Sequence, residues 1–121
     1  MNTAGTGFPK TLRLLRAPQF EHVFAQARKT GGSGLTVLAR CNDLSHPRLG
    51  LIISKRSARA AVARNRIKRL AREAFRHLQD RLGGVDLIIL SRPGLAERDN
   101  PILSGIFSKY LLDAASRCRR S

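Results

Sequence analysis

The region that most constrains the fold is residues 57–82. Its apolar residues recur with the period of an α-helix, and it lies between two short apolar runs. The runs are RLGLIIS (48–54) and VDLIILSR (85–92), and both have the length and aliphatic content of strands. Gly83 and Gly84 follow the stretch and supply the stop that ends a helix. This order predicts an α/β sandwich in which the helix bridges two neighbouring strands. The second run is almost continuously apolar, so we expect a central strand that is buried on both faces.

Segments upstream of these runs extend the sheet and add a first helix. LTVLARC (35–41) is apolar and partly β-branched and predicts another strand, and residues 28–31 predict a short edge strand. APQFEHVFAQAR (17–28) predicts a short amphipathic helix. Its apolar positions recur at i, i+3, i+4 and i+7, and they are Phe20, Val23, Phe24 and Ala27.

The C-terminal part predicts a loop and a last helix. PGLAERDNP (93–101) is rich in turn residues, and residues 102–120 have a helical period. The apolar stripe of this helix is predicted to consist of Ile102, Ile106, Tyr110 and Leu111. Because neither internal repeats nor a linker interrupt the sequence, we expect a single domain over 1–121, with a flexible basic N-terminal arm (about 1–12) and a basic C-terminal tail.

The charge of the chain indicates the class of partner. Among 121 residues there are 23 lysines and arginines against 8 acids, for a net charge of +15, and 42% of the residues are hydrophobic. Such a chain builds a core and attracts polyanions, nucleic acid above all. No apolar run approaches the roughly 20 residues that span a bilayer, so no membrane location is expected. The two cysteines have no CxxC partner and are predicted to be reduced thiols of a cytoplasmic protein.

The long helix has two distinct faces when residues 64–82 are placed 100° apart. One arc is apolar and is predicted to lie on the sheet: Ile67, Leu70, Ala71, Ala74, Phe75 and Leu78. The opposite arc is basic or amidic: Asn65, Lys68, Arg69, Arg72 and Arg76. Arg64 and Arg66 lie at the two margins between the arcs. The apolar arc therefore holds the basic arc at fixed spacing.

A solvated surface is the ordinary explanation of such a charged arc, but two features argue against it here. A solvated helix face usually alternates the two signs of charge, whereas Glu73 is the one acid among residues 62–76. Arginine also outnumbers lysine, and the planar guanidinium suits phosphate contact. The Asn65 amide is suited to a base edge or a ribose hydroxyl. The face therefore predicts nucleic-acid binding.

The segment AVARNRIKRLAREAF contains an arginine-asparagine-arginine motif. Three further segments with a characteristic order and spacing are FPKTLRLLRAPQFEHVFAQAR, HPRLGLIISKRSARAAVARNRIKRL and VDLIILSRPG. In this signature motif and in the order and spacing of the segments, the chain resembles the protein subunit of bacterial ribonuclease P in its Gram-negative form. The resemblance covers nearly the whole chain.

The resemblance implies a fold, two RNA partners and a set of contact residues. The implied fold is an α+β (α/β) two-layer sandwich in the order α-β-β-β-α-β-α, with a four-stranded mixed sheet and a left-handed βαβ crossover through the long basic helix. The implied partners are the catalytic RNA and the single-stranded 5′ leader of precursor tRNA. Residues facing the catalytic RNA would be Arg64, Asn65, Arg66, Lys68, Arg69 and Arg72, and Arg76 lies on the same arc. The leader cleft would include Phe20, Phe24, Ser54 and Lys55, although core packing explains the two rings equally well.

The distribution of acids argues against a nuclease that acts alone. Metal-assisted phosphodiester cleavage needs converging carboxylates, and only Asp86 of the eight acids falls in a predicted strand. The three histidines show no acid–base arrangement. We therefore expect no catalytic residue, metal ligand or cofactor in the protein itself. The resemblance implies that the RNA performs the cleavage with magnesium.

Two other classes of protein share part of this pattern. A structural RNA-binding protein, such as a ribosomal protein, could have the same size and charge, and the signature helix with the preceding SKR distinguishes the two. A helix-turn-helix DNA-binding protein is disfavoured, because the basic helix lies between strands with no helix just before it. DNA is therefore not an expected partner.

Overall fold

The computed structural model describes residues 28–32, 34–42, 44–56 and 58–119. Along the chain these form β1 (Arg28–Gly32), β2 (Leu35–Cys41), β3 (Arg48–Ile52), α2 (Ala61–Leu82), β4 (Val85–Ser91), the short 3-10 helix η2 (Leu95–Glu97) and α3 (Asn100–Arg119). The predicted N-terminal helix with Phe20 and Phe24, and the N-terminal arm, lie outside the described residues.

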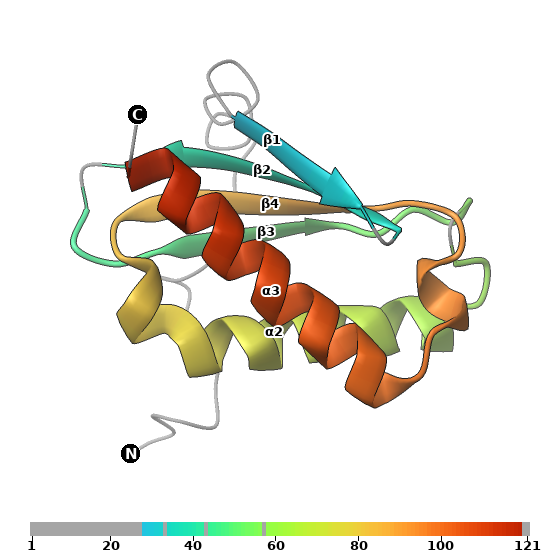
Figure 1. The fold of residues 1–121 in the computed structure, drawn as a ribbon. Coiled ribbons are helices and arrows are strands. Elements are labelled where there is room, and N and C mark those ends of the chain that lie inside the picture. The colour runs from blue at the N-terminus through green and yellow to red at the C-terminus, as the bar shows by residue number, and fades with distance from the viewer. Residues whose placement is uncertain (1–27, 33, 43, 57, 120–121) are drawn as a thin grey trace.

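The four strands form one mixed sheet in the order β1-β2-β4-β3 (Figure 1). β1 pairs with β2 and β2 pairs with β4 in antiparallel fashion, whereas β3 and β4 are parallel. β4 has a strand on either side, and its residues Val85 to Ile89 are all buried. The predictions of a central strand and of a short edge strand at 28–31 are therefore confirmed.

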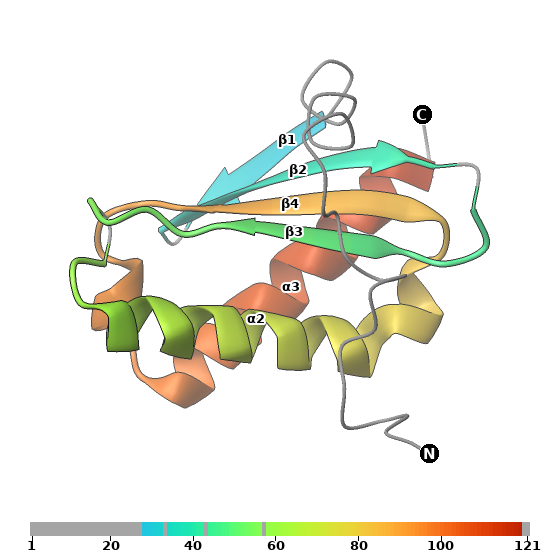
Figure 2. The ribbon, with the colours of Figure 1, turned by 180° about the vertical axis from the view of Figure 1, so that it is seen from behind.

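Both long helices pack on the same face of the sheet, which gives the predicted two-layer sandwich. Figure 1 shows α3 crossing in front of the sheet, and Figure 2 shows α2 running along it on the β3 side. In Figure 1 the helical layer lies on the face of the sheet that is turned toward the viewer, and the parallel strands β3 and β4 both run to the right. Because the chain passes from β3 through α2 to β4, and β4 lies above β3, the crossover is left-handed. Such connections are rare because strand twist favours the right-handed form.

The core lies between the helices and one face of the sheet. Val37, Leu87 and Ile89 of the sheet join Phe75 of α2 and Phe107 of α3 in one buried cluster. All six residues of the predicted apolar arc of α2 are buried in it, which confirms the predicted orientation of this helix. Leu38 and Ile88 are buried on the opposite face of the sheet, outside this cluster.

Three boundaries and one helix face differ from the predictions. α2 begins at Ala61 rather than at residue 57, and β3 ends at Ile52 rather than at residue 54. α3 begins at Asn100. In its predicted apolar stripe Leu111 is buried and Ile106 and Tyr110 pack partly buried against the core, but the prediction is wrong for Ile102, which is 49% exposed. The fully buried residues of α3 are Leu103, Phe107, Leu111, Ala114 and Ala115. Apolar side chains occur on several sides of this helix, so packing rather than periodicity selects the buried side.

The thiol prediction is wrong for Cys41, which is disulfide-bonded at the exposed end of β2. The side chain of Cys118 lies outside the described residues. Among the helices of the described ranges, neither α2 nor α3 is both long and apolar enough to cross a membrane.

Candidate nucleic-acid interface

The outer face of α2 brings the predicted basic residues onto one surface. Arg64, Lys68, Arg72 and Arg76 are spaced by four residues and form a ridge along the helix. Asn65, Arg69 and Arg72 are exposed, and the remaining predicted residues of the helix are half-buried. We refer to Arg64, Asn65, Arg66, Lys68, Arg69, Arg72 and Arg76 together as the basic face. The packing of the opposite side fixes the direction in which this face points.

One acid partly compensates the charge of the basic face. Arg69 Nη1 lies 3.1 Å from Glu73 Oε2, and the two side chains are 56% and 44% exposed. Such an exposed pair stabilises a helix by about 0.3–0.5 kcal/mol. Cations four residues apart along the ridge cost similar amounts each. The basic face is therefore not an arrangement that stabilises the isolated helix.

Arg64 and Arg66 lie at the two margins of the face, as the sequence predicted, and each contacts a different neighbouring segment. Arg64 Nη1 donates to the carbonyl oxygens of Ala58 at 2.9 Å and Arg59 at 2.7 Å, just before α2. Arg66 donates to residues 96–100, which run from η2 to the first residue of α3. Sequence reasoning missed these bonds, and the only signal for them was the marginal position of both residues on the helix.

The beginning of α2 has no side-chain cap. Ala60 occupies the N-cap position without a side-chain hydrogen bond, and no acid lies in the first turn. The positive end of the helix dipole is thus not neutralised by residues of its own first turn. This end of the helix adds to the positive potential of the basic face.

Two predicted leader residues, Ser54 and Lys55, lie two and three positions after the end of β3. Ser54 and Lys55 are exposed, and the backbone N–H of Ser54 donates to Ser91 Oγ at 3.1 Å. The carbonyl of Ser54 accepts a bond from the N–H of Ala58 at 3.1 Å, which fixes the turn before α2. Ile52, two residues earlier, is 37% exposed. The structure therefore brings Ser54 and Lys55 close to the beginning of α2, while Phe20 and Phe24 lie outside the described residues.

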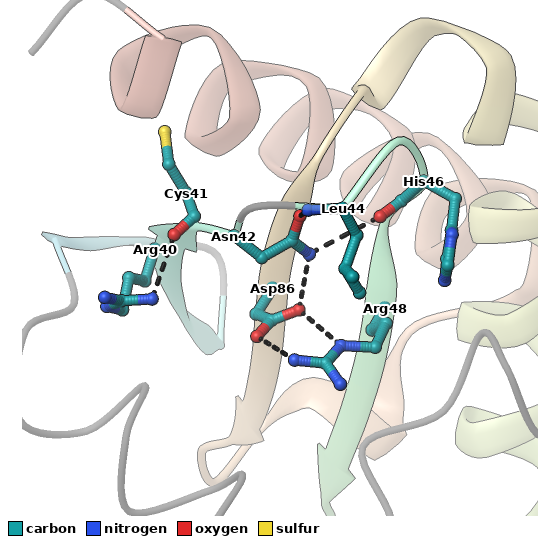
Figure 3. A network of polar contacts seen from close by, with 7 residues as sticks. All are labelled: Arg40, Cys41, Asn42, Leu44, His46, Arg48 and Asp86. Atoms are coloured by element: carbon teal, nitrogen blue, oxygen red, sulfur yellow. Dashed lines mark hydrogen bonds and ion pairs between the residues drawn. The ribbon is translucent and has the colours of Figure 1, made fainter.

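Asp86, the strand acid, is used inside the protein. It is 3% exposed and accepts bonds on Oδ1 and Oδ2 from Arg48 Nε at 2.8 Å and Nη2 at 2.7 Å (Figure 3). Asn42 Nδ2 donates to Asp86 Oδ1 at 2.7 Å and to the carbonyl of His46 at 3.4 Å. The Leu44 N–H donates to Asn42 Oδ1 at 2.9 Å, so the network also holds the loop between β2 and β3.

The electrostatics of this network are those of a structural ion pair. The hydrogen bonds to Asp86 raise the pKa of Arg48, although partial burial of the guanidinium opposes the rise. No group of three His, Cys, Asp or Glu residues in the described part of the chain is arranged to hold a metal ion. Glu73, Asp113 and Glu97 lie on α2, α3 and η2 and are separate from Asp86. The sequence did not predict this network, because its partners are distant along the chain.

Comparison with known proteins identifies the family. A family model described as Ribonuclease P matches residues 8–115 of the chain. The chain belongs to the ribonuclease P protein family. It is therefore a protein component of ribonuclease P, the endoribonuclease that processes tRNA, as the resemblance of its motifs implied.

Two relatives with 44% and 51% identity come from Gram-negative bacteria. A protein of Stutzerimonas stutzeri, named ribonuclease P protein component, is 51% identical over 104 residues, which are 85% of this chain and 79% of the relative. A protein of the same name from Methylococcus capsulatus is 44% identical over 117 residues, which are 97% of this chain and 91% of the relative.

Solved structures of the family share the fold. The RNase P protein of Thermotoga maritima matches with a TM-score of 0.74 and 27% identity, covering 82% of this chain and 97% of that one. The RNase P protein of Staphylococcus aureus has a TM-score of 0.79 over 88% of this chain and 96% of that one, at 24% identity. The mixed sheet and its helical layer are therefore those of the ribonuclease P proteins.

Proposed function

We propose that the basic face of α2 binds the catalytic RNA of ribonuclease P. The observation that carries the proposal is the fixed orientation of this helix. Six apolar residues are buried on one side, so the cations of the other side are held in a row at helical spacing. A row of this kind matches successive phosphates of an RNA backbone without the entropy cost of ordering a flexible tail.

The composition of the basic face favours RNA binding rather than a charged surface that contacts only solvent. Arginine supplies planar donors for phosphate oxygens, and Asn65 adds an exposed amide among the cations. Glu73, the one acid among residues 62–76, pairs with Arg69. The protein would then screen the repulsion between two polyanions, the catalytic RNA and its substrate.

We also propose that the 5′ leader of precursor tRNA passes the end of β3, where Ser54 and Lys55 are exposed. A lysine there neutralises backbone phosphate, and the rings of Phe20 and Phe24 would supply stacking that tolerates any base. The partly exposed Ile52 adds an apolar contact on the same strand. The proximity of this strand end to the beginning of α2 allows one protein to contact both RNAs.

The proposal assigns the chemistry to the RNA. Asp86 is held by Arg48 and Asn42, and the other acids of the described ranges do not converge. The magnesium that the reaction needs would thus be bound by the RNA-containing holoenzyme and not by the protein alone. A cytoplasmic location, where both RNAs occur, stays a prediction.

Reconstitution tests the assignment of chemistry. Protein freed of RNA should leave precursor tRNA intact in magnesium, and addition of the cognate catalytic RNA should give site-specific removal of the leader at low magnesium. High salt or high magnesium should partly replace the protein, because each screens phosphate repulsion. Cleavage by RNA-free protein that a fold-neutral carboxylate substitution abolishes would contradict the proposal.

Truncation of either ring tests the leader contact. Phe20→Ala or Phe24→Ala should lower affinity for leader-bearing precursor by about 1–3 kcal/mol and leave affinity for mature tRNA unchanged, because only the precursor carries leader bases that could stack on the rings. A ring that belongs to the core would instead cost about 3–5 kcal/mol of unfolding free energy. Equal losses for the two RNAs would remove the leader assignment.

A further inference from the structure

Arg66, the second arginine of the signature, makes more hydrogen bonds within the protein than its place in an RNA-binding motif suggests. Nε donates to Asn100 Oδ1 at 2.7 Å, Nη1 donates to the Ala96 carbonyl at 3.4 Å, and Nη2 donates to the Arg98 carbonyl. All three nitrogens of the guanidinium thus bind one segment, residues 96–100, that is about thirty positions away in the sequence. The bonds bring this segment to the first two turns of α2.

We infer that Arg66 is a positioning residue that clamps residues 96–100 against α2 and thereby holds Arg98 beside the basic face as an additional phosphate contact. The inference rests on the proposed function, because it assumes that the basic face binds RNA. It deepens that function in two ways. Arg66 contributes to RNA binding indirectly, by holding another segment in place, and residues 96–100 become part of the RNA-binding surface.

The packing of the clamped segment explains why it needs such a contact. Leu95 and Leu103, which precede and follow it, are fully buried and anchor its two ends. Between these anchors Arg98 is exposed, and its carbonyl is one of the acceptors of Arg66. Without Arg66 the middle of the segment would lose the bonds that join it to α2.

The neighbouring acid Asp99 does not oppose the inference, because it is engaged locally. Its Oδ1 accepts a bond from the N–H of Ile102 at 3.1 Å in the first turn of α3. Its carbonyl accepts a bond from the N–H of Leu103 at 2.9 Å. Asp99 therefore caps α3, whereas Arg98 faces solvent.

The chemistry of the clamp separates it from a direct phosphate contact. A guanidinium is planar and donates from three nitrogens at once, whereas a lysine ammonium is a single point charge. A lysine at position 66 would keep the charge and lose the geometry. Arg66→Lys should consequently behave as a loss of function if Arg66 positions the segment, and nearly as wild type if it only neutralises a phosphate.

The free protein provides the first measurement. Amide hydrogen exchange should accelerate by about tenfold or more at Glu97, Arg98 and Leu103 in Arg66→Lys, since each lost hydrogen bond is worth about a factor of ten. Asn100→Ala, which changes no charge, should accelerate the same amides to a smaller degree. Arg69→Lys is the matched control on the exposed side and should leave them unchanged. Unchanged exchange in Arg66→Lys would overturn the inference.

Binding of the catalytic RNA as a function of salt provides the second measurement. Arg98→Ala should reduce the slope of log K against log salt by about 1, as expected for one lost phosphate contact. Arg66→Lys should weaken binding to a similar extent although it keeps its charge, and Arg66→Lys combined with Arg98→Ala should be no weaker than Arg66→Lys alone. Additive losses, wild-type binding by Arg66→Lys, or no effect of Arg98→Ala would each overturn the inference.

A further variant separates failure of this inference from failure of the proposed function. Arg69→Ala removes an exposed cation of the basic face that takes no part in the clamp. If its salt slope equals that of wild type, the basic face does not bind RNA and the proposed function fails, whatever the exchange data show. If its slope falls while Arg66→Lys binds normally, the basic face binds RNA and only the positioning role of Arg66 is wrong.

Discussion

Arginines are used in opposite ways in two regions of this protein, the polar network where β3 and β4 begin and the outer face of α2. In the first region Arg48 meets the buried carboxylate of Asp86 with two bonds of 2.7 and 2.8 Å, and Asn42 satisfies a further position of that carboxylate. In the second region the side chains of Arg69 and Glu73 are both about half exposed, and residues 62–76 contain six cations and one acid. Charge that is satisfied internally supports the fold, whereas charge in excess indicates a partner outside the chain.

The two regions also differ in how they respond to solvent conditions. The raised pKa of Arg48 means that its contribution to stability is fully present below the ordinary pKa of arginine and is lost only as pH rises through the raised value. The guanidinium side of the pair therefore persists throughout the neutral range. The exposed charges of α2 are instead screened by salt, so salt should act mainly on RNA binding.

The largest effect expected from this contrast is that of Asp86→Ala. The substitution leaves the guanidinium of Arg48 without its carboxylate in a partly buried site and should lower the free energy of unfolding by about 3–5 kcal/mol. Urea denaturation measures the loss. The double variant Arg48→Met, Asp86→Leu is the control, and it should recover much of the stability because no unpaired charge is left. A loss below about 1 kcal/mol for Asp86→Ala would mean that the pair contributes no more than a surface pair.

Removal of two cations from the basic face should weaken RNA binding and leave stability nearly unchanged, in contrast to Asp86→Ala, which should lower stability. Lys68→Ala with Arg69→Ala should reduce the salt slope of RNA binding by about 2, one for each lost phosphate contact. The free energy of unfolding should change by less than about 0.5 kcal/mol, because relief of repulsion along the ridge offsets the lost pair with Glu73. An unaltered slope in the double variant would show that the face is merely solvated.

The smallest effect is expected for Glu73→Gln, which removes the acid that pairs with Arg69. Loss of its pair with Arg69 should cost about 0.3–0.5 kcal/mol of unfolding free energy. Affinity for the catalytic RNA should rise slightly at low salt, since the acid no longer repels phosphate, and the gain should vanish at high salt. Weaker RNA binding by this variant at low salt would indicate that Glu73 positions Arg69 rather than neutralising it.

The sequence by itself determined the parts of the protein that depend on local periodicity. The six apolar positions of α2 fall on one arc at 100° per residue, and all six are buried. The uninterrupted apolar run of β4 identified the central strand, and Gly83, which has a φ of 73°, ends α2 where predicted. The marginal placement of Arg64 and Arg66 followed from the same geometry, and the assignments of individual RNA contacts stay predictions.

Only the tertiary structure decided which distant groups meet. Asn42 and Arg48 reach Asp86 across 44 and 38 positions of the chain, and Arg66 reaches Asn100 across 34. The buried side of α3 was likewise undetermined, because apolar residues on several of its sides made more than one stripe acceptable until α2 and the sheet selected Leu103, Phe107 and Leu111. Periodicity reports which residues of one element share a face. The partner of that face depends on how strands and helices pack, and no local pattern encodes it.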